Sequence, residues 1–226
     1  MSHSKKLQFI LNKLYELNPD KIELKLDRVL RLANDLGNPH KKLKNVITVT
    51  GTNGKGGTAF YLKEMLQAHG YSVALFQSPF LYNFLTRFLI NNQPLEEEKF
   101  INYVIEVDKA NDNKPITFFE YITCIAFKAF SDANCDFNII ETGLGGKFDS
   151  TNVNYDDLKT QILTPISLDH KDFLGDTIKE ITHNKCGIIK DHSHVVIAKQ
   201  SNEVLGFIDE ELKRKKITKH IFEEDF

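Results

Sequence analysis

The chain has 226 residues, 41% of them hydrophobic and 27% charged, with only 12 glycines and 6 prolines, so a buried core is expected and collagen-like or disordered chains are excluded. A formal net charge of −2 creates no field that would gather nucleic acid or an anionic membrane, so any bound phosphate must be held locally. The three cysteines form no C-x-x-C pair, which argues against a disulfide framework or a zinc site and predicts a cytoplasmic protein.

The first 40 residues predict two amphipathic helices. Apolar residues recur at helical spacing in two blocks, Leu7 to Leu17 and Leu26 to Ala33, separated by the turn Asn18-Pro19-Asp20. Gly37 to His40 ends the second helix. The N-terminus has no apolar core of signal-peptide length, and no run of about 18 apolar residues occurs, so we expect neither export by an obvious signal nor a membrane span.

From residue 46 onward, short β-branched runs alternate with helical segments. Expected strands are 46–50, 71–76, 137–140, 161–166, 195–198 and 217–222, and expected helices are 58–69, 96–110, 120–130, 177–186 and 202–215. This alternation predicts an α/β fold with a mainly parallel sheet and helices on both faces. We expect a single domain, with N-terminal helices in 1–40, an α/β core in 41–226, and functional groups at the carboxyl ends of strands.

A glycine-rich loop follows the first predicted strand and precedes a helix, which is the context of a phosphate-binding loop. Its residues, the candidate ATP ligands, are Gly51, Thr52, Asn53, Gly54, Lys55, Gly56, Gly57 and Thr58. Glycines let backbone N–H groups turn inward, the helix N-terminus adds positive charge, and Lys55 supplies an ammonium for the β and γ phosphates. The strict G-x-x-x-x-G-K-[ST] pattern fails, because Val49 stands at its first glycine and Gly56 follows the lysine. A glycine-rich turn with an incidental lysine therefore stays open.

In this shorter form, GTNGKG after VITVT resembles the folylpolyglutamate synthase/dihydrofolate synthase family, a branch of the Mur-ligase superfamily. Other segments match that family in the same order: Leu26-Asp27-Arg28 with Gly37 to His40, Gln77 to Leu81, Thr117 to Glu120, Glu141 to Asn152, Leu168 to Gly175, and Lys185 to Lys190. The resemblance implies a P-loop-type Mur-ligase central domain. It also implies a ligase in which ATP phosphorylates the carboxylate of dihydropteroate or a reduced folate. The amine of L-glutamate then attacks the acyl phosphate, giving an amide, ADP and phosphate.

By this resemblance, Lys55, His170 and Lys185 are catalytic and two Mg²⁺ ions are expected. Ser78 and Glu141 would hold the first ion, and His170 with a carbamylated Lys185 the second. From the residues alone, Glu141 suits a cation because it ends a predicted strand, although a solvated strand end stays open. A turn hydroxyl stays open for Ser78, and an unmodified amine that pairs a phosphate or a helix end stays open for Lys185. An imidazole is an unusual ligand for Mg²⁺, so chemistry alone favours a hydrogen-bonding role for His170.

The resemblance also implies a pterin site. Its residues would be Thr117, Phe118, Phe119, Glu120, Phe148, Asp149 and Ser150. The two adjacent phenylalanine rings can stack on a flat heterocycle, with Glu120 accepting from its amino groups. Core packing stays open for one of the two rings.

The chain departs from the family pattern at named positions. Gly57 replaces a Ser or Thr hydroxyl, and whether Thr58 substitutes for it is open; Phe80 replaces a His, and Leu85-Thr86 a polar pair. Family members are roughly twice this length, so a separately encoded C-terminal domain is an expected partner of an otherwise monomeric chain, with no nucleic acid and no membrane. The alternative function is a truncated, catalytically impaired nucleotide-binding remnant. A Mur-type cell-wall ligase is disfavoured, because Gly56 follows Lys55 where those enzymes usually have a hydroxyl residue.

Overall fold

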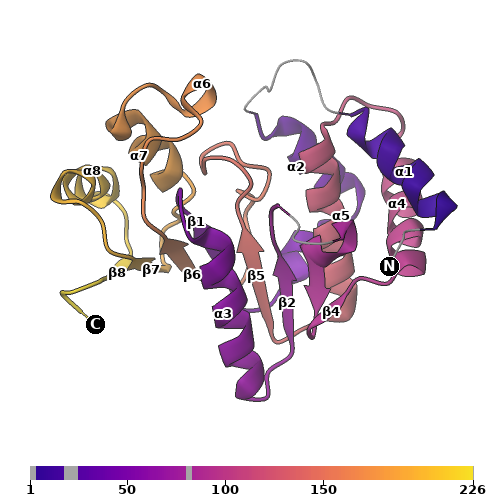
Figure 1. Cartoon of the computed structure of the whole chain (residues 1–226), viewed down its shortest axis with the longest axis horizontal. Helices are drawn as coiled ribbons and strands as arrows, with labels where there is room; N and C mark the ends of the chain where they lie inside the picture. Colours follow the sequence, from indigo (N-terminus) through magenta and orange to yellow (C-terminus); the bar gives the residue numbers. More distant parts are fainter. Residues whose placement is uncertain (1–3, 18–24, 80–82, 226) are drawn as a thin grey trace.

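The chain folds around one twisted sheet with helices on both faces, as a computed structural model that describes residues 4–17, 25–79 and 83–225 shows (Figure 1). In these residues the sheet has eight strands in the order β4-β3-β2-β5-β1-β6-β7-β8. The strands are β1 (Val46–Thr50), β2 (Val73–Phe76), β3 (Phe88–Ile90), β4 (Gln93–Pro94), β5 (Phe137–Glu141), β6 (Leu158–Leu163), β7 (His194–Ile197) and β8 (Thr218–Ile221). The run from β2 to β8 is parallel, which confirms the predicted α/β class.

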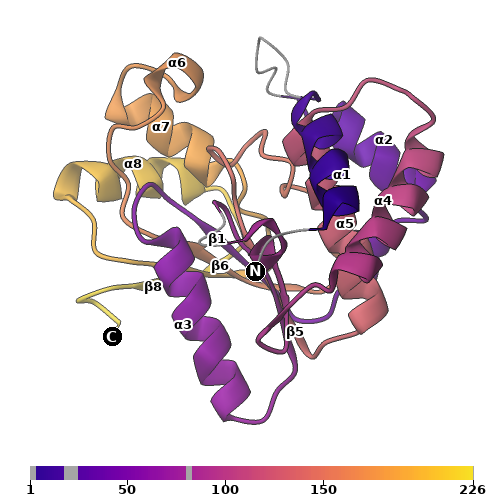
Figure 2. The ribbon, with the colours of Figure 1, turned by 45° about the vertical axis from the view of Figure 1, so that its right-hand side comes forward.

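The helices lie in two groups at the two ends of the sheet, with one helix between them (Figures 1 and 2). The helices are α1 (Lys5–Tyr15), α2 (Asp27–Asp35), α3 (Lys55–Ala68), α4 (Glu97–Asn111), α5 (Phe118–Ala133), α6 (Lys171–Leu174), α7 (Ile178–Cys186) and α8 (Asn202–Leu212), with 3₁₀ turns at Pro39–Lys42 and Phe84–Arg87. Helices α1, α2, α4 and α5 gather near β2 and β3, and α6, α7 and α8 near β6 and β7. The two predicted N-terminal helices are confirmed, and the predicted turn between them lies outside the described residues.

The period-2 pattern of the central strands places two separate apolar clusters on the two faces of the sheet. On β2, Ala74 and Phe76 belong to the cluster that includes α5, whereas Val73 and Leu75 belong to the cluster that includes α3. On β5, Ile140 belongs to the cluster with α5, and Ile139 to the cluster with α3. Successive side chains of a strand point to opposite faces, so one short strand fills both clusters. A third cluster joins β6 and β7 to α7 and α8.

Two details of the fold differ from expectation. The segment 88–94, where no strand was expected, forms the antiparallel hairpin β3–β4 at the sheet edge, with Asn91 and Asn92 at positive φ in its turn. Such turns require two residues that tolerate φ > 0, which asparagine does. The helix expected from residue 58 begins at Lys55, because Gly54 adopts the left-handed conformation (φ 83°) and starts it. No helix in the described ranges is both long and apolar enough to cross a membrane.

Candidate functional site

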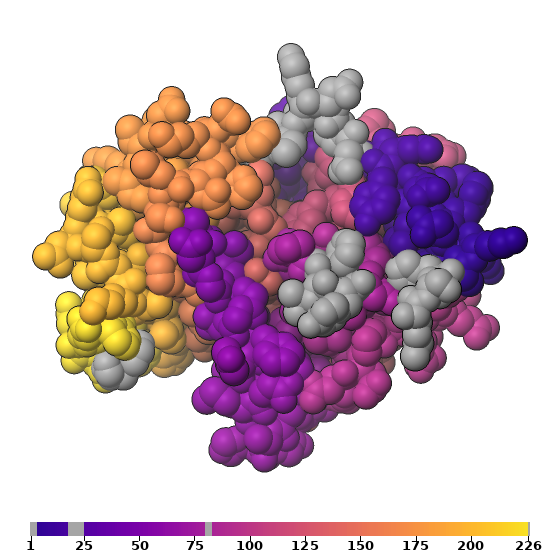
Figure 3. Space-filling view, viewed as in Figure 1, coloured from indigo at the N-terminus to yellow at the C-terminus, as the bar shows by residue number. Residues whose placement is uncertain are grey.

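The candidate site lies where the carboxyl ends of neighbouring parallel strands meet. Gly51 follows β1, Gln77 and Ser78 follow β2, and Glu141 ends β5, beside β1 in the sheet. A pocket of about 500 Å³ opens there, lined by Thr52, Gly54, Lys55, Gly56, Gly57, Phe60, Tyr61, Gln77, Ser78, Pro79 and Glu141. Helix α3, which starts at this pocket, runs across the face of the molecule shown in Figure 3. The predicted loop, the predicted strand-end carboxylate and Ser78 therefore do come together.

The glycine-rich loop is held in place by the segment that follows β6. Gly51 has a φ of 142°, and a Cβ at this position would overlap the Thr164 side chain and lie 2.7 Å from the Thr164 carbonyl oxygen. The N–H groups of Thr52 and Asn53 donate to the Pro165 carbonyl at 2.9 and 3.2 Å. These two amides brace the loop. The amides left for an anion are those at the start of α3, where the first turn of a helix has no intrahelical acceptor.

Lys55 and Gly57 stand at this helix start. The Lys55 ammonium donates to the Thr52 carbonyl at 3.4 Å and lines the pocket. A Cβ on Gly57 would meet no atom within 4 Å, so the place of the family's hydroxyl is open space. Thr58, the residue that might replace that hydroxyl, is not among the residues that line the pocket. Phe60 and Tyr61, one turn further along α3, do line it. Their positions in the first turn of the predicted helix 58–69, directly after the glycine-rich loop, could have identified them from the sequence.

Glu141 is buried at the floor of the pocket, with only 2% of its surface exposed. The Ser78 N–H donates to its Oε2 at 3.0 Å, and Gly56 lies against its carboxylate. Burial raises the pKa of Glu141 to about 7, against the opposing effects of the Ser78 hydrogen bond and of the charges on Lys55 and Arg87. A carboxylate kept partly protonated by burial is one that a cation would stabilise strongly. The solvated strand end considered above is thereby excluded.

Lys185, on α7, reaches the same loop from the other side. Its side chain is 2% exposed, and its ammonium donates to the Gly51 carbonyl at 2.7 Å. Burial, together with the nearby charge of Lys55, lowers the pKa of Lys185 to about 8, while Asp169 and Asp149 act in the opposite direction. At pH 7 roughly a tenth of this side chain is therefore a neutral amine, far more than for an ordinary lysine.

His170 is half-exposed and starts the short helix α6 at positive φ (47°). Its Nε2 lies 3.4 Å from Asp169 Oδ2. In the part of the chain that the structure describes, no three His, Cys, Asp or Glu side chains gather as a metal-binding group. His170 thus has the Asp169 carboxylate as a neighbour, and both its metal-binding and its hydrogen-bonding role stay predictions.

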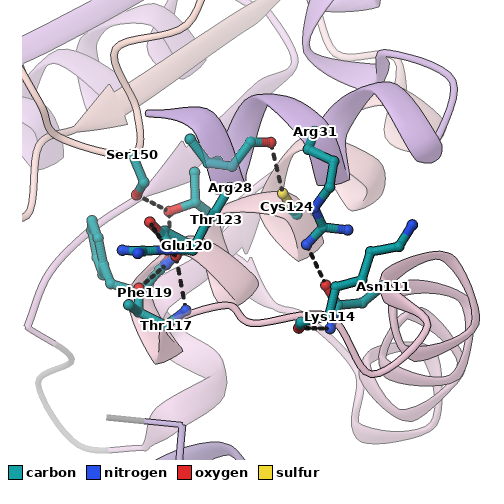
Figure 4. A network of polar contacts seen from close by, with 11 residues as sticks. Arg28, Arg31, Asn111, Lys114, Thr117, Phe119, Glu120, Thr123, Cys124 and Ser150 are labelled. Atoms are coloured by element: carbon teal, nitrogen blue, oxygen red, sulfur yellow. Dashed lines mark hydrogen bonds and ion pairs between the residues drawn. The ribbon is translucent and has the colours of Figure 1, made fainter. Parts of the chain in front are cut away.

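The segment 117–120 is tied into the scaffold (Figure 4). Thr117 and Glu120 form a capping box at the start of α5, and Arg28 on α2 donates to both Glu120 oxygens at 3.1 and 2.9 Å. Glu120 therefore already has partners where we expected it to accept from a heterocycle, because a helix start and a half-buried guanidinium both bind this carboxylate. Phe118 is buried and stacks on Tyr15 at a centroid distance of 5.0 Å, so core packing explains this ring.

The remaining predicted pterin residues lie in the loop after β5, close to Phe119. The Phe119 ring fills the space beside Gly143, where a Cβ would overlap it. Asp149 is buried and accepts from the N–H groups of Leu144 and Thr151, and Ser150 shares a hydrogen bond of 2.8 Å with Thr123. Phe148 is 38% exposed. Phe119 also stacks on the buried Phe76 at a centroid distance of 5.9 Å, so core packing explains part of its position, whereas the Phe148 side chain remains exposed.

The sequence of this chain is similar to those of known proteins over most of its length. The model of the Mur ligase middle domain matches residues 49–225. The chain is 39% identical over 197 residues to the dihydrofolate synthetase of Saccharomyces cerevisiae, covering 85% of this chain and 46% of that protein. It is 41% identical over 197 residues to the dihydrofolate synthase/folylpolyglutamate synthase of Bacillus subtilis, covering 84% and 45%.

Solved structures agree in fold. Escherichia coli FolC in complex with DHPP and ADP superposes with a TM-score of 0.87 at 34% identity, covering 95% of this chain and 51% of that one. An FPGS-AMPPCP complex superposes with a TM-score of 0.89 at 31% identity, covering 96% and 54%. The chain therefore spans about half the length of the relatives that it matches.

Proposed function

The chain belongs to the Mur ligase middle-domain family, and from this and the geometry of the pocket we propose that it is the ATP-handling part of a folate ligase. The reaction would add L-glutamate to dihydropteroate or a reduced folate by way of an acyl phosphate. The observation that carries the proposal is the meeting of Lys55, Glu141 and Lys185 around one loop. Solved relatives at 31–34% identity that hold ADP or an ATP analogue support ATP as the substrate.

In this proposal the start of α3 binds the phosphates. The amides of Lys55, Gly56 and Gly57 lie at the positive end of the helix, and Lys55 adds an ammonium. Phosphoryl transfer needs little covalent chemistry from the protein. It needs in-line positioning and cations close to anionic oxygens, in a site shielded from water.

The oxygen atoms at the pocket floor fit Mg²⁺. The Glu141 carboxylate and the Ser78 hydroxyl are the hard donors that this ion prefers, and few protein ligands are needed when phosphates and water complete the shell. We propose these two residues for the first ion, which would neutralise charge on the β and γ phosphates. For the second ion the predicted ligands are His170 and a carbamylated Lys185.

The lowered pKa of Lys185, about 8, supports its modification. Carbamylation joins a neutral amine to carbon dioxide and releases one proton, so it needs an amine that has lost its charge. The product is a carboxylate-like oxygen donor in place of a nitrogen donor. Intact-mass measurement at raised carbon dioxide, with Lys185→Met as the control, tests this step.

The pterin subsite and the cytoplasmic location stay predictions. For the first, exposed Phe148 and the Phe119 ring beside Gly143 support an aromatic wall. For the second, all three cysteines are buried and unpaired, as in a reducing compartment. A separately encoded C-terminal domain as partner, and a monomeric state otherwise, also stay predictions.

A second candidate function is a nucleotide-binding remnant with impaired catalysis. Gly57 favours it, because the pocket lacks a hydroxyl at a position where the family carries one. The two candidates agree on ATP binding and differ on turnover.

Two measurements test the proposal. Calorimetric titration with Mg-ATP should show binding that Lys55→Met weakens at least tenfold. Lys41→Met, at an exposed lysine that does not line the pocket, should leave it unchanged. ADP formation that requires both dihydropteroate and glutamate supports the ligase. Binding without such turnover favours the remnant, and absence of Mg-ATP binding refutes both.

A further inference from the structure

A second hollow, of about 660 Å³, lies between the loop after β5 and the helices α6, α7 and α8. These helices form one end of the molecule, coloured orange and yellow in the space-filling view (Figure 3). Among the described residues, none lines both this hollow and the phosphate-loop pocket. The hollow is therefore separate from the phosphate-loop pocket, and it shares only Phe148 with the predicted pterin residues.

A chain of three polar side chains crosses one wall of the hollow. His183 Nδ1 lies 3.0 Å from Glu211 Oε1, and the Lys147 ammonium lies 3.3 Å from His183 Nε2. An ammonium can only donate, so Nε2 is the accepting nitrogen and Nδ1–H donates to Glu211. Glu211 thus fixes the orientation of the His183 ring.

Lys147 keeps its positive charge available. The other lining lysine, Lys179, pairs with Glu210 at 3.2 Å, and the lining carboxylate Glu180 accepts from Thr177 in the capping box of α7. Within residues 4–17, 25–79 and 83–225, no carboxylate lies at ion-pair distance from the Lys147 ammonium. Two of its three N–H donors remain after the bond to His183, so this wall can bind an anion.

One aromatic ring lies beside that charge, and a second lines the same hollow. The Lys147 ammonium lies 5.4 Å from the centroid of the Phe148 ring. Phe148 and Phe173 both line the hollow, with 38% and 39% of their surface exposed. Exposed rings that share a concave surface with one cation are suited to a flat apolar body that carries a single negative group.

We propose that this hollow binds a small aromatic carboxylate, with the carboxylate on Lys147 and the ring against Phe148 and Phe173. A phosphate would gain one cation and lose its hydration against apolar walls, so the monocarboxylate is favoured. Helix α7 connects the hollow to the phosphate loop through two adjacent residues. Asn184 binds the amides of Gly146 and Lys147 at 3.1 and 2.8 Å, and its neighbour Lys185 holds Gly51.

Sodium benzoate is the probe, titrated into the full chain by calorimetry at constant ionic strength, with acetate, cyclohexanecarboxylate and inorganic phosphate as comparison anions. Benzoate should bind saturably in the millimolar range and at least tenfold more tightly than acetate or phosphate. Lys147→Met should weaken it at least tenfold, Lys147→Arg should largely retain it, and the control Lys213→Met on exposed α8-end surface should leave it unchanged.

Phe148→Ala provides a second variant, with an expected loss of about fivefold and a larger loss for benzoate than for cyclohexanecarboxylate. Amide chemical shifts should move at Phe148 and His183 on benzoate addition. Absence of saturable benzoate binding, or equal affinity in the wild type and in folded Lys147→Met, overturns the proposal. Tighter binding of phosphate than of benzoate overturns the ligand class.

Discussion

The substitution Gly51→Ala probes the contact on which the phosphate loop depends. The φ of 142° at this position is one that a residue with a Cβ rarely adopts, and the added carbon would overlap the Thr164 side chain and lie 2.7 Å from its carbonyl oxygen. Backbone strain of this kind costs about 1–3 kcal/mol, and overpacking a closed site adds about 1–3 kcal/mol. We expect the free energy of unfolding to fall by roughly 4 kcal/mol.

For a chain of this length, such a loss lowers the midpoint of thermal unfolding by about 8–16 °C. Urea unfolding followed by circular dichroism gives the free energy, and Gly57→Ala is the matched control. Gly57 lies in the same loop at the start of α3, and a Cβ there would meet nothing within 4 Å. It should change stability by no more than about 1 kcal/mol.

The double variant Gly51→Ala/Thr164→Ala isolates the cause, because it removes the Thr164 Oγ1 that the new carbon overlaps but leaves the backbone strain and the carbonyl contact. We expect partial recovery, seen as a coupling energy of at least about 1 kcal/mol in a double-mutant cycle. A loss below about 1 kcal/mol for Gly51→Ala, or no coupling with Thr164→Ala, would refute the packing argument.

Three other predictions concern titration and the missing hydroxyl. The pKa of Glu141 is raised from 4.5 to about 7, so the unfolded chain holds fewer protons than the folded chain between these pH values. In metal-free buffer, the free energy of unfolding should therefore fall by ~3 kcal/mol as the pH rises through that window. Urea titrations at several pH values measure this slope, and Glu141→Gln should flatten it. The pKa of Lys185 is lowered from 10.5 to about 8, so the unfolded chain holds more protons between these values. Stability should rise by ~3 kcal/mol from pH 8 to 10.5, and the same slope in Lys185→Met would contradict the assignment. Gly57→Ser fits without a clash and should raise Mg-ATP affinity severalfold in calorimetry; unchanged affinity would show that the hydroxyl has no role here.

Local features of the sequence were sufficient to predict the fold class and the position of the phosphate-binding loop. Alternating strands and helices predict the parallel sheet, because each element depends on the periodicity of a few neighbouring residues. The loop from Gly51 to Thr58 was recognisable, since its glycines and Lys55 stand between a buried strand and a helix. Glu141 was predicted at the strand end that it occupies. The helix starts were less accurate. Gly54 acts through a left-handed conformation that a pattern does not specify, whereas the capping box of Thr117 and Glu120 is a recognisable pattern that the prediction did not use.

Tertiary structure alone decided which partners the polar side chains have. Arg28 binds Glu120 across 92 positions of sequence, and Lys185 binds the carbonyl of Gly51 across 134. Local periodicity carries no information about such pairs, because they depend on how helices pack across the sheet. The same packing buries Glu141 and Lys185, which moves their pKa values toward neutrality, and it leaves the Lys147 ammonium beside the exposed Phe148 ring. Charge states and accessible surfaces are properties of the assembled fold, because desolvation depends on all the atoms that surround a group.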